Sequence, residues 1–176
     1  SALTCVDDFS TGTCSVSTQA TAIGFSSDVT LDASFTGRRI KFSQNPNVYE
    51  VTFSNTTAIT ITPALSGDQN ITNGAYVIFQ PYYALAENFD RFLKDKGLEY
   101  WSGGRPTDII CVPDHDFKED YSASPGIPGI CRLVTRGTDN LQYVETSPPP
   151  DKVYNLPYEY IRKLLPLREG TAGTIA

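Results

Sequence analysis

The sequence contains no methionine, and it has only one histidine and one tryptophan among its 176 residues. No stretch approaches the roughly 20 apolar residues that a membrane-spanning helix needs. No charged segment followed by an apolar run opens the chain, as it would in a signal peptide. A membrane partner is therefore not expected. Because position 1 is not methionine, we expect a processed product or an excerpt that lacks an N-terminal part.

Positive charge is scarce. The chain has 14 Lys and Arg against 20 Asp and Glu, a net charge of −6. Binding of duplex or single-stranded nucleic acid needs a basic field, so nucleic acid is not expected as a primary ligand. The basic residues are scattered, apart from 162–163 and the group Arg38, Arg39 and Lys41. A strand with basic side chains on its outer face is the simplest interpretation of that group.

Cysteine is limited to Cys5, Cys14, Cys111 and Cys131. Their spacing matches no zinc ribbon or finger, in which cysteine pairs lie two to four residues apart. Cys5 and Cys14 can close a small loop in an oxidising compartment. Cys111 and Cys131 lie in apolar, strand-like contexts and are expected to behave as small buried hydrophobes. We favour free thiols over disulfides, although the sequence leaves the disulfide state open.

The aromatic and β-branched content favours strands: the chain has ten Tyr and nine Phe, with many Thr and Val. Five segments alternate apolar and polar residues between turn clusters, at 29–33, 38–42, 48–53, 58–62 and 75–80. We therefore predict a mainly β fold. Its parts are an extended, irregular segment at 1–27, a small antiparallel barrel or meander module at 28–83, a second β-rich region at 84–168 and a flexible tail at 169–176.

The second region contains the best helix candidate, at residues 84–96. Apolar residues recur there at the spacing of one helix face, namely Leu85, Phe89, Phe92 and Leu93. Gly97 is well placed to end the helix. Further strands are predicted at 109–112, at 130–135 and 141–146 as a hairpin, and at 153–161, where Pro157 interrupts the strand or puts it at an edge.

Sequence motifs that would indicate catalysis or ligand binding are weak in this chain. His115 lies among the carboxylates of 114–120, which suggests a hydrolytic dyad or a calcium loop. The EF-hand pattern lacks its central glycine and its final glutamate, and no motif serine or cysteine accompanies the histidine. No phosphate-binding or dinucleotide-binding glycine motif is present. We interpret 114–120 as a solvated acidic loop, and we predict no enzyme activity and no catalytic, metal or cofactor site.

Four aromatic residues form the other candidate site. Trp101, Tyr100, Tyr82 and Tyr83 can form a stacking platform for a sugar. They can equally seal one end of the core or lie between subunits, where aromatic residues are enriched. We favour packing or an interface.

Four segments then occur in a suggestive order, at 35–42, 48–53, 57–67 and 74–91. Their succession of β-strands and turns resembles a group of tailed-bacteriophage virion proteins of the head–tail adaptor or neck type. Residues 141–151 and 154–162 look like the closing pattern of that group, so the resemblance spans roughly 28–168. Ala86 stands where the group tends to have proline, and the helical N-terminal portion expected of the group is absent.

The resemblance implies a non-enzymatic virion structural protein, a head–tail connector or upper-tail component. Its partners would be copies of itself in a ring, together with other virion proteins such as portal or tail components. A cyclic ring joins one face of a subunit to a different face of the next. The candidate interface residues are Arg38, Arg39, Lys41, Tyr82, Tyr83 and Trp101, with 114–120 as an acidic counterpart.

Two other functions stay open from the sequence. One is a carbohydrate-binding or adhesion module of a phage tail or a secreted surface protein, with Trp101 in its aromatic platform. The other is a hydrolase centred on His115.

Overall fold

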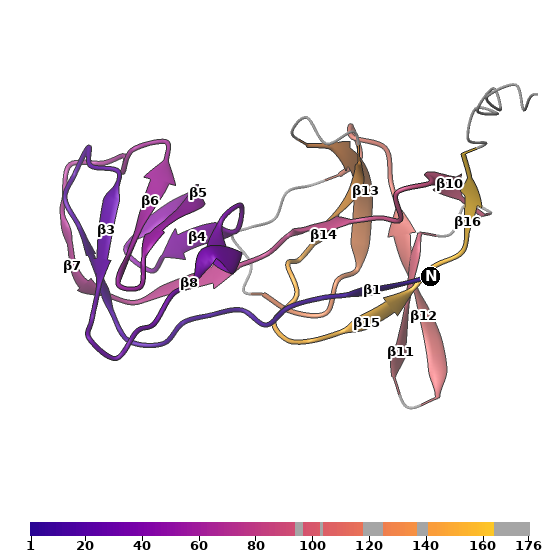
Figure 1. Cartoon of the computed structure of the whole chain (residues 1–176), viewed down its shortest axis with the longest axis horizontal. Coiled ribbons are helices and arrows are strands. Elements are labelled where there is room, and N and C mark those ends of the chain that lie inside the picture. The colour runs from indigo at the N-terminus through magenta and orange to yellow at the C-terminus, as the bar shows by residue number, and fades with distance from the viewer. Residues whose placement is uncertain (94–96, 103, 118–124, 137–140, 164–176) are drawn as a thin grey trace, which may run out of the picture.

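The structure is a computed structural model that describes residues 1–93, 97–102, 104–117, 125–136 and 141–163. Within these residues the fold is mainly β, as the sequence predicts, and the sole helical element is the 3-10 turn η1 (Ala33–Phe35). Two modules lie side by side along the long axis (Figure 1). We call residues 9–79 the barrel module, and residues 1–5 with 82–162 the half-barrel module. Among the described residues, no helix is long and apolar enough to cross a membrane.

The barrel module is a nearly closed antiparallel sheet with the strand order β7-β2-β3-β6-β5-β4-β8. Ser43 N donates to Ala75 O at 3.0 Å and extends the pairing of β4 with β8 by one step. The strands are β2 (Cys14–Val16), β3 (Ala22–Phe25), β4 (Arg39–Phe42), β5 (Asn45–Asn55), β6 (Ala58–Thr62), β7 (Ile71–Gly74) and β8 (Tyr76–Phe79).

Alternation along these strands builds the barrel core. On β4, Ile40 and Phe42 are buried, whereas Arg39 and Lys41 face outward, as predicted for the basic group. Ile59 and Ile61 on β6 follow the same rule. Each large apolar side chain removed from water contributes about 1.5–3 kcal/mol, so the alternating strands stabilise this sheet through one shared core.

The first 27 residues are not one irregular segment, because they contain three strands. β2 and β3 are interior members of the barrel sheet, so the barrel begins before residue 28. β1 (Ala2–Thr4) belongs to the half-barrel module, where Leu3 is the register partner of Leu156 on β15 (Asn155–Pro157). Strands of three or four residues are too short to show a clear period-two pattern, so sequence analysis did not predict these strands.

The half-barrel module contains the sheet β11-β12-β13-β14-β9 and the strand pairs β1–β15 and β10–β16. Its core is separate from that of the barrel. The predicted hairpin is confirmed as β13 with β14, and the predicted last strand is divided into β15 and β16. The remaining bounds are β9 (Tyr82–Ala84), β10 (Phe89–Phe92), β11 (Leu98–Ser102), β12 (Arg105–Cys111), β13 (Ile130–Thr135), β14 (Gln142–Ser147) and β16 (Tyr160–Arg162).

The helix predicted at 84–96 is wrong over the described residues 84–93. β9 ends at Ala84, and β10 pairs with β16 instead of continuing a helix. The Phe89 ring stacks on Tyr160 with centroids 5.6 Å apart, a long-range contact that overrides the local helical spacing. Leu93, which a helix would have buried, is 40% exposed. Residues 94–96 and the predicted flexible tail at 169–176 lie outside the described residues.

Candidate functional site

Charged and aromatic side chains meet where the two modules join. Glu50 on β5 of the barrel contacts two guanidinium groups, with Oε2 3.6 Å from Arg39 Nη2 and Oε1 3.4 Å from Arg136 Nη2. The Tyr82 ring of β9 lies between them, 3.8 Å from Arg136 Cζ and 5.7 Å from Arg39 Cζ. Arg39 also donates to the Tyr82 hydroxyl at 3.4 Å. We call Arg39, Glu50, Tyr82 and Arg136 the junction cluster. It links the modules by charge and by cation–π contact.

A buried ion pair supports this cluster from the half-barrel side. Arg132 on β13 and Glu145 on β14 are direct cross-strand partners. Arg132 Nε and Nη2 lie 2.7 Å and 2.6 Å from Glu145 Oε2. Glu145 is fully buried, and its partner on the other neighbouring strand is Tyr82. This bonded charge pair links β13 to β14, and Tyr82 on β9 is the next register partner of Glu145.

The loop after β12 covers the exposed side of the same ion pair. The Arg132 guanidinium lies 4.6 Å above the Phe117 ring and 3.7 Å from Asp114 Oδ1. His115 and Asp116 form an exposed pair, with Nε2 3.3 Å from Oδ2 and side chains 79% and 61% exposed. The described part of the loop is thus a solvated acidic turn with one buried aromatic residue, and 118–120 lie outside the described residues.

The structure separates most of the predicted interface residues. Arg39 and Tyr82 come together, but within one chain. The Arg38 guanidinium lies 4.5 Å above the Phe35 ring and donates to Ser34 O at 3.2 Å. Burial lowers the pKa of Arg38. Lys41 borders a shallow hollow of about 210 Å³ on the outer face of β4 and β8.

Tyr83 is a core residue. It is 5% exposed, and its hydroxyl accepts a hydrogen bond from Val6 N at 3.5 Å. Burial raises its pKa above the ordinary value. Tyr83 therefore presents almost no surface to a partner. It can affect the predicted interface only through the packing of the core.

Trp101 lies on the β11–β12 hairpin, which projects from the half-barrel module (Figure 1). Its side chain is 54% exposed, and Ile110 on the same hairpin is 55% exposed. β11 is at the edge of its sheet and pairs only with β12 in the described part of the chain. Tyr100 packs edge-on against Tyr154, with ring centroids 5.3 Å apart. With Tyr82 at the junction, the four-residue platform is not assembled around Trp101.

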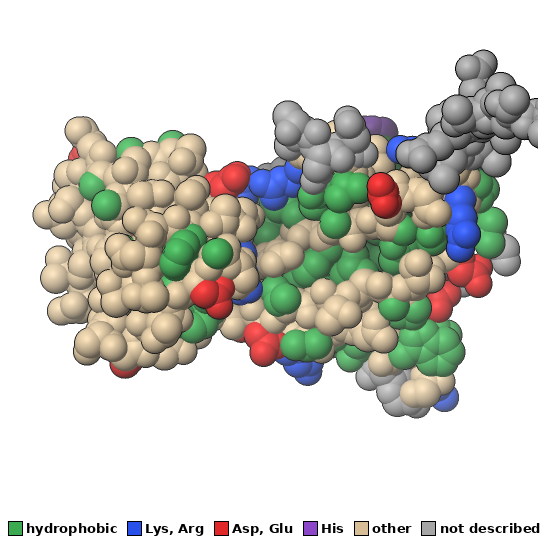
Figure 2. All heavy atoms as spheres, viewed as in Figure 1, with side chains coloured by type: hydrophobic (Ala, Val, Ile, Leu, Met, Phe, Trp, Pro, Cys, Tyr) green, Lys and Arg blue, Asp and Glu red, His purple; other side chains and the backbone are tan. Residues whose placement is uncertain are grey.

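The two modules also differ in surface. On the face shown in Figure 2, the barrel module presents mostly backbone and side chains that are neither hydrophobic nor charged, whereas hydrophobic side chains gather on the half-barrel module. Acidic and basic side chains adjoin where the modules meet. Large exposed apolar patches often mark surfaces that contact another molecule. The half-barrel module is therefore the better candidate for a partner contact.

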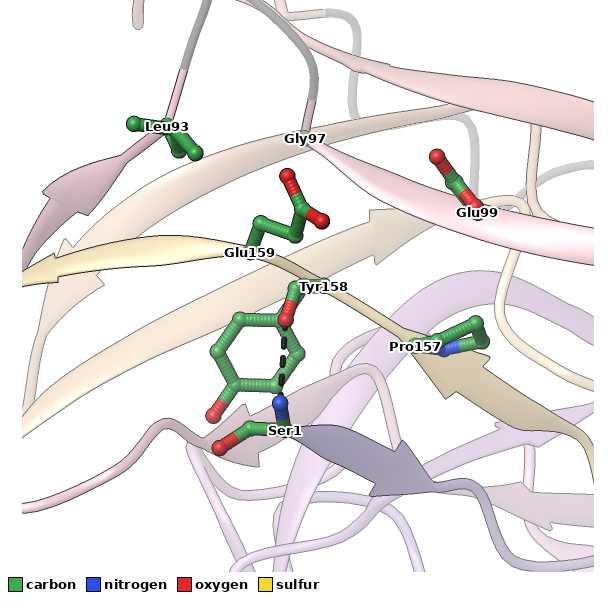
Figure 3. A pocket seen from close by; sticks show the side chains of 7 residues that line it. All are labelled: Ser1, Leu93, Gly97, Glu99, Pro157, Tyr158 and Glu159. Atoms are coloured by element: carbon green, nitrogen blue, oxygen red, sulfur yellow. Dashed lines mark hydrogen bonds between the residues drawn. The ribbon is translucent and has the colours of Figure 1, made fainter.

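A groove of about 440 Å³ opens at the end of the half-barrel module (Figure 3). Glu99 of β11 and Glu159, between β15 and β16, supply carboxylates to it. The Ser1 amino group donates to Tyr158 O at 3.2 Å beside them. Among the residues that the structure describes, no group of three His, Cys, Asp or Glu side chains is arranged to hold a metal ion.

All four cysteines are free thiols, as favoured from the sequence. Cys5 and Cys14 lie in the cores of different modules and close no loop. Burial raises the pKa of each to about 12. Cys131 is buried as predicted, whereas Cys111 is only half-buried. Cys5, Cys14 and Cys131 are therefore buried in the two cores, and Cys111 alone among the four is partly exposed.

The sequence did not indicate Glu50, Arg132, Arg136 or Glu145. Oppositely charged residues become visible as partners only when the strand register is known, and these partners are 11 to 86 positions apart. Comparisons with protein-family models, curated proteins and solved structures find no match to this chain. Any functional proposal must therefore rest on the residues of this chain, on their geometry and on the sequence resemblance.

Proposed function

We propose that this chain is a non-enzymatic structural subunit of a tailed-phage virion, in the head–tail connector or upper tail, which assembles with further copies of itself into a ring. The resemblance of residues 28–168 to neck and adaptor proteins supports the class. The observation that carries the assembly role is the projecting β11–β12 hairpin with the exposed Trp101.

The hairpin has the properties of a docking element. An edge strand offers unpaired backbone groups to a neighbouring chain, and free edges are usually protected unless they are used. Tryptophan is among the residues most enriched in the energetic centres of protein interfaces. Trp101 is 54% exposed on the edge strand β11, and β15 lies beside part of that strand. In a ring, this hairpin would contact a different face of the next subunit.

The junction cluster suits the same role. A ring subunit must hold its two modules at one angle, because an error in angle accumulates around the ring. Glu50 and Tyr82, from different modules, share the guanidinium groups of Arg39 and Arg136. The predicted pairing of Arg39 with the acidic loop of a neighbour is less favoured, because Arg39 already contacts Glu50 and Tyr82 of its own chain.

Self-association of the purified chain tests the assembly role. Trp101→Ala should leave the melting temperature nearly unchanged, because the side chain is more than half exposed, but should weaken self-association about 30-fold or more if Trp101 is an interface hot spot. Val153→Ala, at a 59% exposed position on another segment, is the matched control and should change neither quantity. Equal self-association of both variants and wild type, measured by sedimentation, would refute the assembly role of the hairpin.

The position in a particle needs a second experiment, the mapping of labelled chain on intact virus particles. A ring of label at the neck would support the proposal. Label at the distal tip would favour the carbohydrate-binding or adhesion alternative, for which glycan arrays with wild type and Trp101→Ala are the test. Absence of label from every particle would overturn the virion assignment.

A further inference from the structure

Cys111 and Cys131 lie opposite each other in the sole parallel pairing among the described strands. β12 and β13 share two register pairs, Ile110 with Ile130 and Cys111 with Cys131. Val112 N adds one hydrogen bond to Cys131 O at 2.7 Å. In the sheet order, this short ladder is the connection between the β11–β12 hairpin and the other three strands. The cysteine pair is thus located where the hairpin is attached.

The two side chains also meet on one side of the sheet. A Cβ atom built on Gly97 would lie 2.9 Å from Cys131 Sγ and 3.0 Å from Cys111 Cβ. Both side chains therefore point toward the same small space above Gly97. Paired strands run about 4.8 Å apart, which is within the Cα separation of roughly 4.4–6.8 Å that a disulfide spans. A bond between the sulfur atoms needs no separation of the strands.

The two thiols differ in reactivity. Cys131 is buried, whereas Cys111 is half-buried and open to small reagents. Interaction with Cys131 lowers the pKa of Cys111, and the same interaction together with burial raises the pKa of Cys131, whose thiol lies 3.9 Å from Ile109 O as a hydrogen-bond donor. The thiolate is the nucleophile in disulfide exchange. Cys111 is therefore the attacking residue and Cys131 the residue that completes the bond.

We propose that Cys111 and Cys131 are a redox modification site that a low-molecular-weight disulfide converts into a reversible cross-strand disulfide. The Cys111 thiolate attacks one sulfur of the reagent and releases one thiolate, which leaves a mixed disulfide on Cys111. Cys131 then loses its proton, attacks Cys111 Sγ and displaces the second thiolate. Two protein thiols are oxidised, and one reagent disulfide is reduced to two thiols. This site does not depend on the virion assignment.

The bond would fix the hairpin to the sheet. It would close a loop from residue 111 to residue 131, and a bond across a loop of this length typically stabilises a protein enough to raise its melting temperature by about 5–10 °C. The hairpin that carries Trp101 would then be held by a covalent link beside a two-pair ladder. Oxidation would thereby reduce opening of β12, which amide hydrogen exchange measures.

The test treats the full chain with oxidised glutathione and maps its peptides without reduction. We expect a peptide that links Cys111 to Cys131, a loss of two hydrogens in mass, slower amide exchange in β12, and reversal by a reducing agent. The double variant Cys5→Ala/Cys14→Ala, which keeps both core positions apolar, should form the same link between Cys111 and Cys131. Cys131→Ser should stop at the mixed disulfide on Cys111, because the second step lacks its nucleophile.

Three results would overturn the proposal. These are a wild-type protein that keeps glutathione on Cys111 without forming the link, a link that joins Cys5 or Cys14 instead, and a linked protein with unchanged exchange in β12. The wild-type experiment needs no substitution, so it remains decisive if the Cys131→Ser variant fails to fold. Alkylation of the untreated protein provides a second measurement, in which Cys111 should react first among the four thiols.

Discussion

The buried pair of Arg132 and Glu145 allows the sharpest prediction about stability. Arg132→Met removes the guanidinium from a carboxylate that is fully buried. Breaking a buried ion pair by removal of one member costs about 3–5 kcal/mol. For a chain of this length, that loss corresponds to a fall in melting temperature of about 10 °C. Glu145→Leu should cost less, about 1–3 kcal/mol, because Arg132 is 18% exposed and keeps Asp114 at 3.7 Å.

The double variant Arg132→Met/Glu145→Leu isolates the pair itself. Replacement of a buried ion pair by apolar residues of similar size is often neutral, so we expect this variant to lie within about 1 kcal/mol of wild type. Urea unfolding gives the free energy of unfolding of wild type, the two single variants and the double variant. It is followed by far-UV circular dichroism and by the fluorescence of Trp101. Because Trp101 is the sole tryptophan and lies in the half-barrel module, its signal reports the module that contains the pair.

The order of the single variants decides whether the reasoning holds. The reasoning requires Arg132→Met to be less stable than Glu145→Leu, because the Glu145 carboxylate is more deeply buried than the Arg132 guanidinium. Equal losses would show that solvent reaches the carboxylate after substitution. Losses below about 1 kcal/mol for both would refute the argument, since that is the range of an exposed ion pair.

Three further predictions concern other parts of the molecule. Gly97→Ala places a Cβ 2.6 Å from Ile109 O, so it should cost about 1–3 kcal/mol in urea unfolding, whereas Gly24→Ala, with no atom within 4 Å of its Cβ, should be nearly neutral. Burial raises the pKa of Cys14 from 9.0 to about 12, so the unfolded chain releases this proton first. Stability should therefore fall as pH rises from 9 toward 12, and less so in Cys14→Ala; equal slopes in pH-dependent unfolding would contradict this. Glu50→Gln should cost less than about 1 kcal/mol but change the module angle seen in X-ray solution scattering, whereas an unchanged scattering profile would exclude a clamping role.

Much of the sheet structure was predictable because alternation is local. The outward basic residues of β4 and the β13–β14 hairpin follow from period-two patterns and turn residues within a few positions of one another. The prediction of a helix at 84–96 was wrong for the same reason: it rested on the local spacing of apolar residues alone. The pairing of β10 with β16 comes from residues about 70 positions away, and it determined the outcome.

The candidate site residues also differ in whether local sequence or strand register identifies them. Trp101 was predicted as an interface residue, and it lies exposed on a projecting hairpin. The structure placed Arg39 and Tyr82 in one cluster, but with Glu50 and Arg136, which the sequence had not selected. Opposed charges and opposed cysteines become partners only through strand register, and register depends on the whole fold.

The sequence by itself determined the fold class, the acidic surface charge and the apolar faces of the longer strands, because composition and alternation dictate which side chains avoid water. The tertiary structure decided which strands pair, how the N-terminal segment is divided between two modules, and where Cys111 meets Cys131. Those features depend on contacts between distant segments. The loss of chain entropy on forming such contacts is offset only when the complete core is buried.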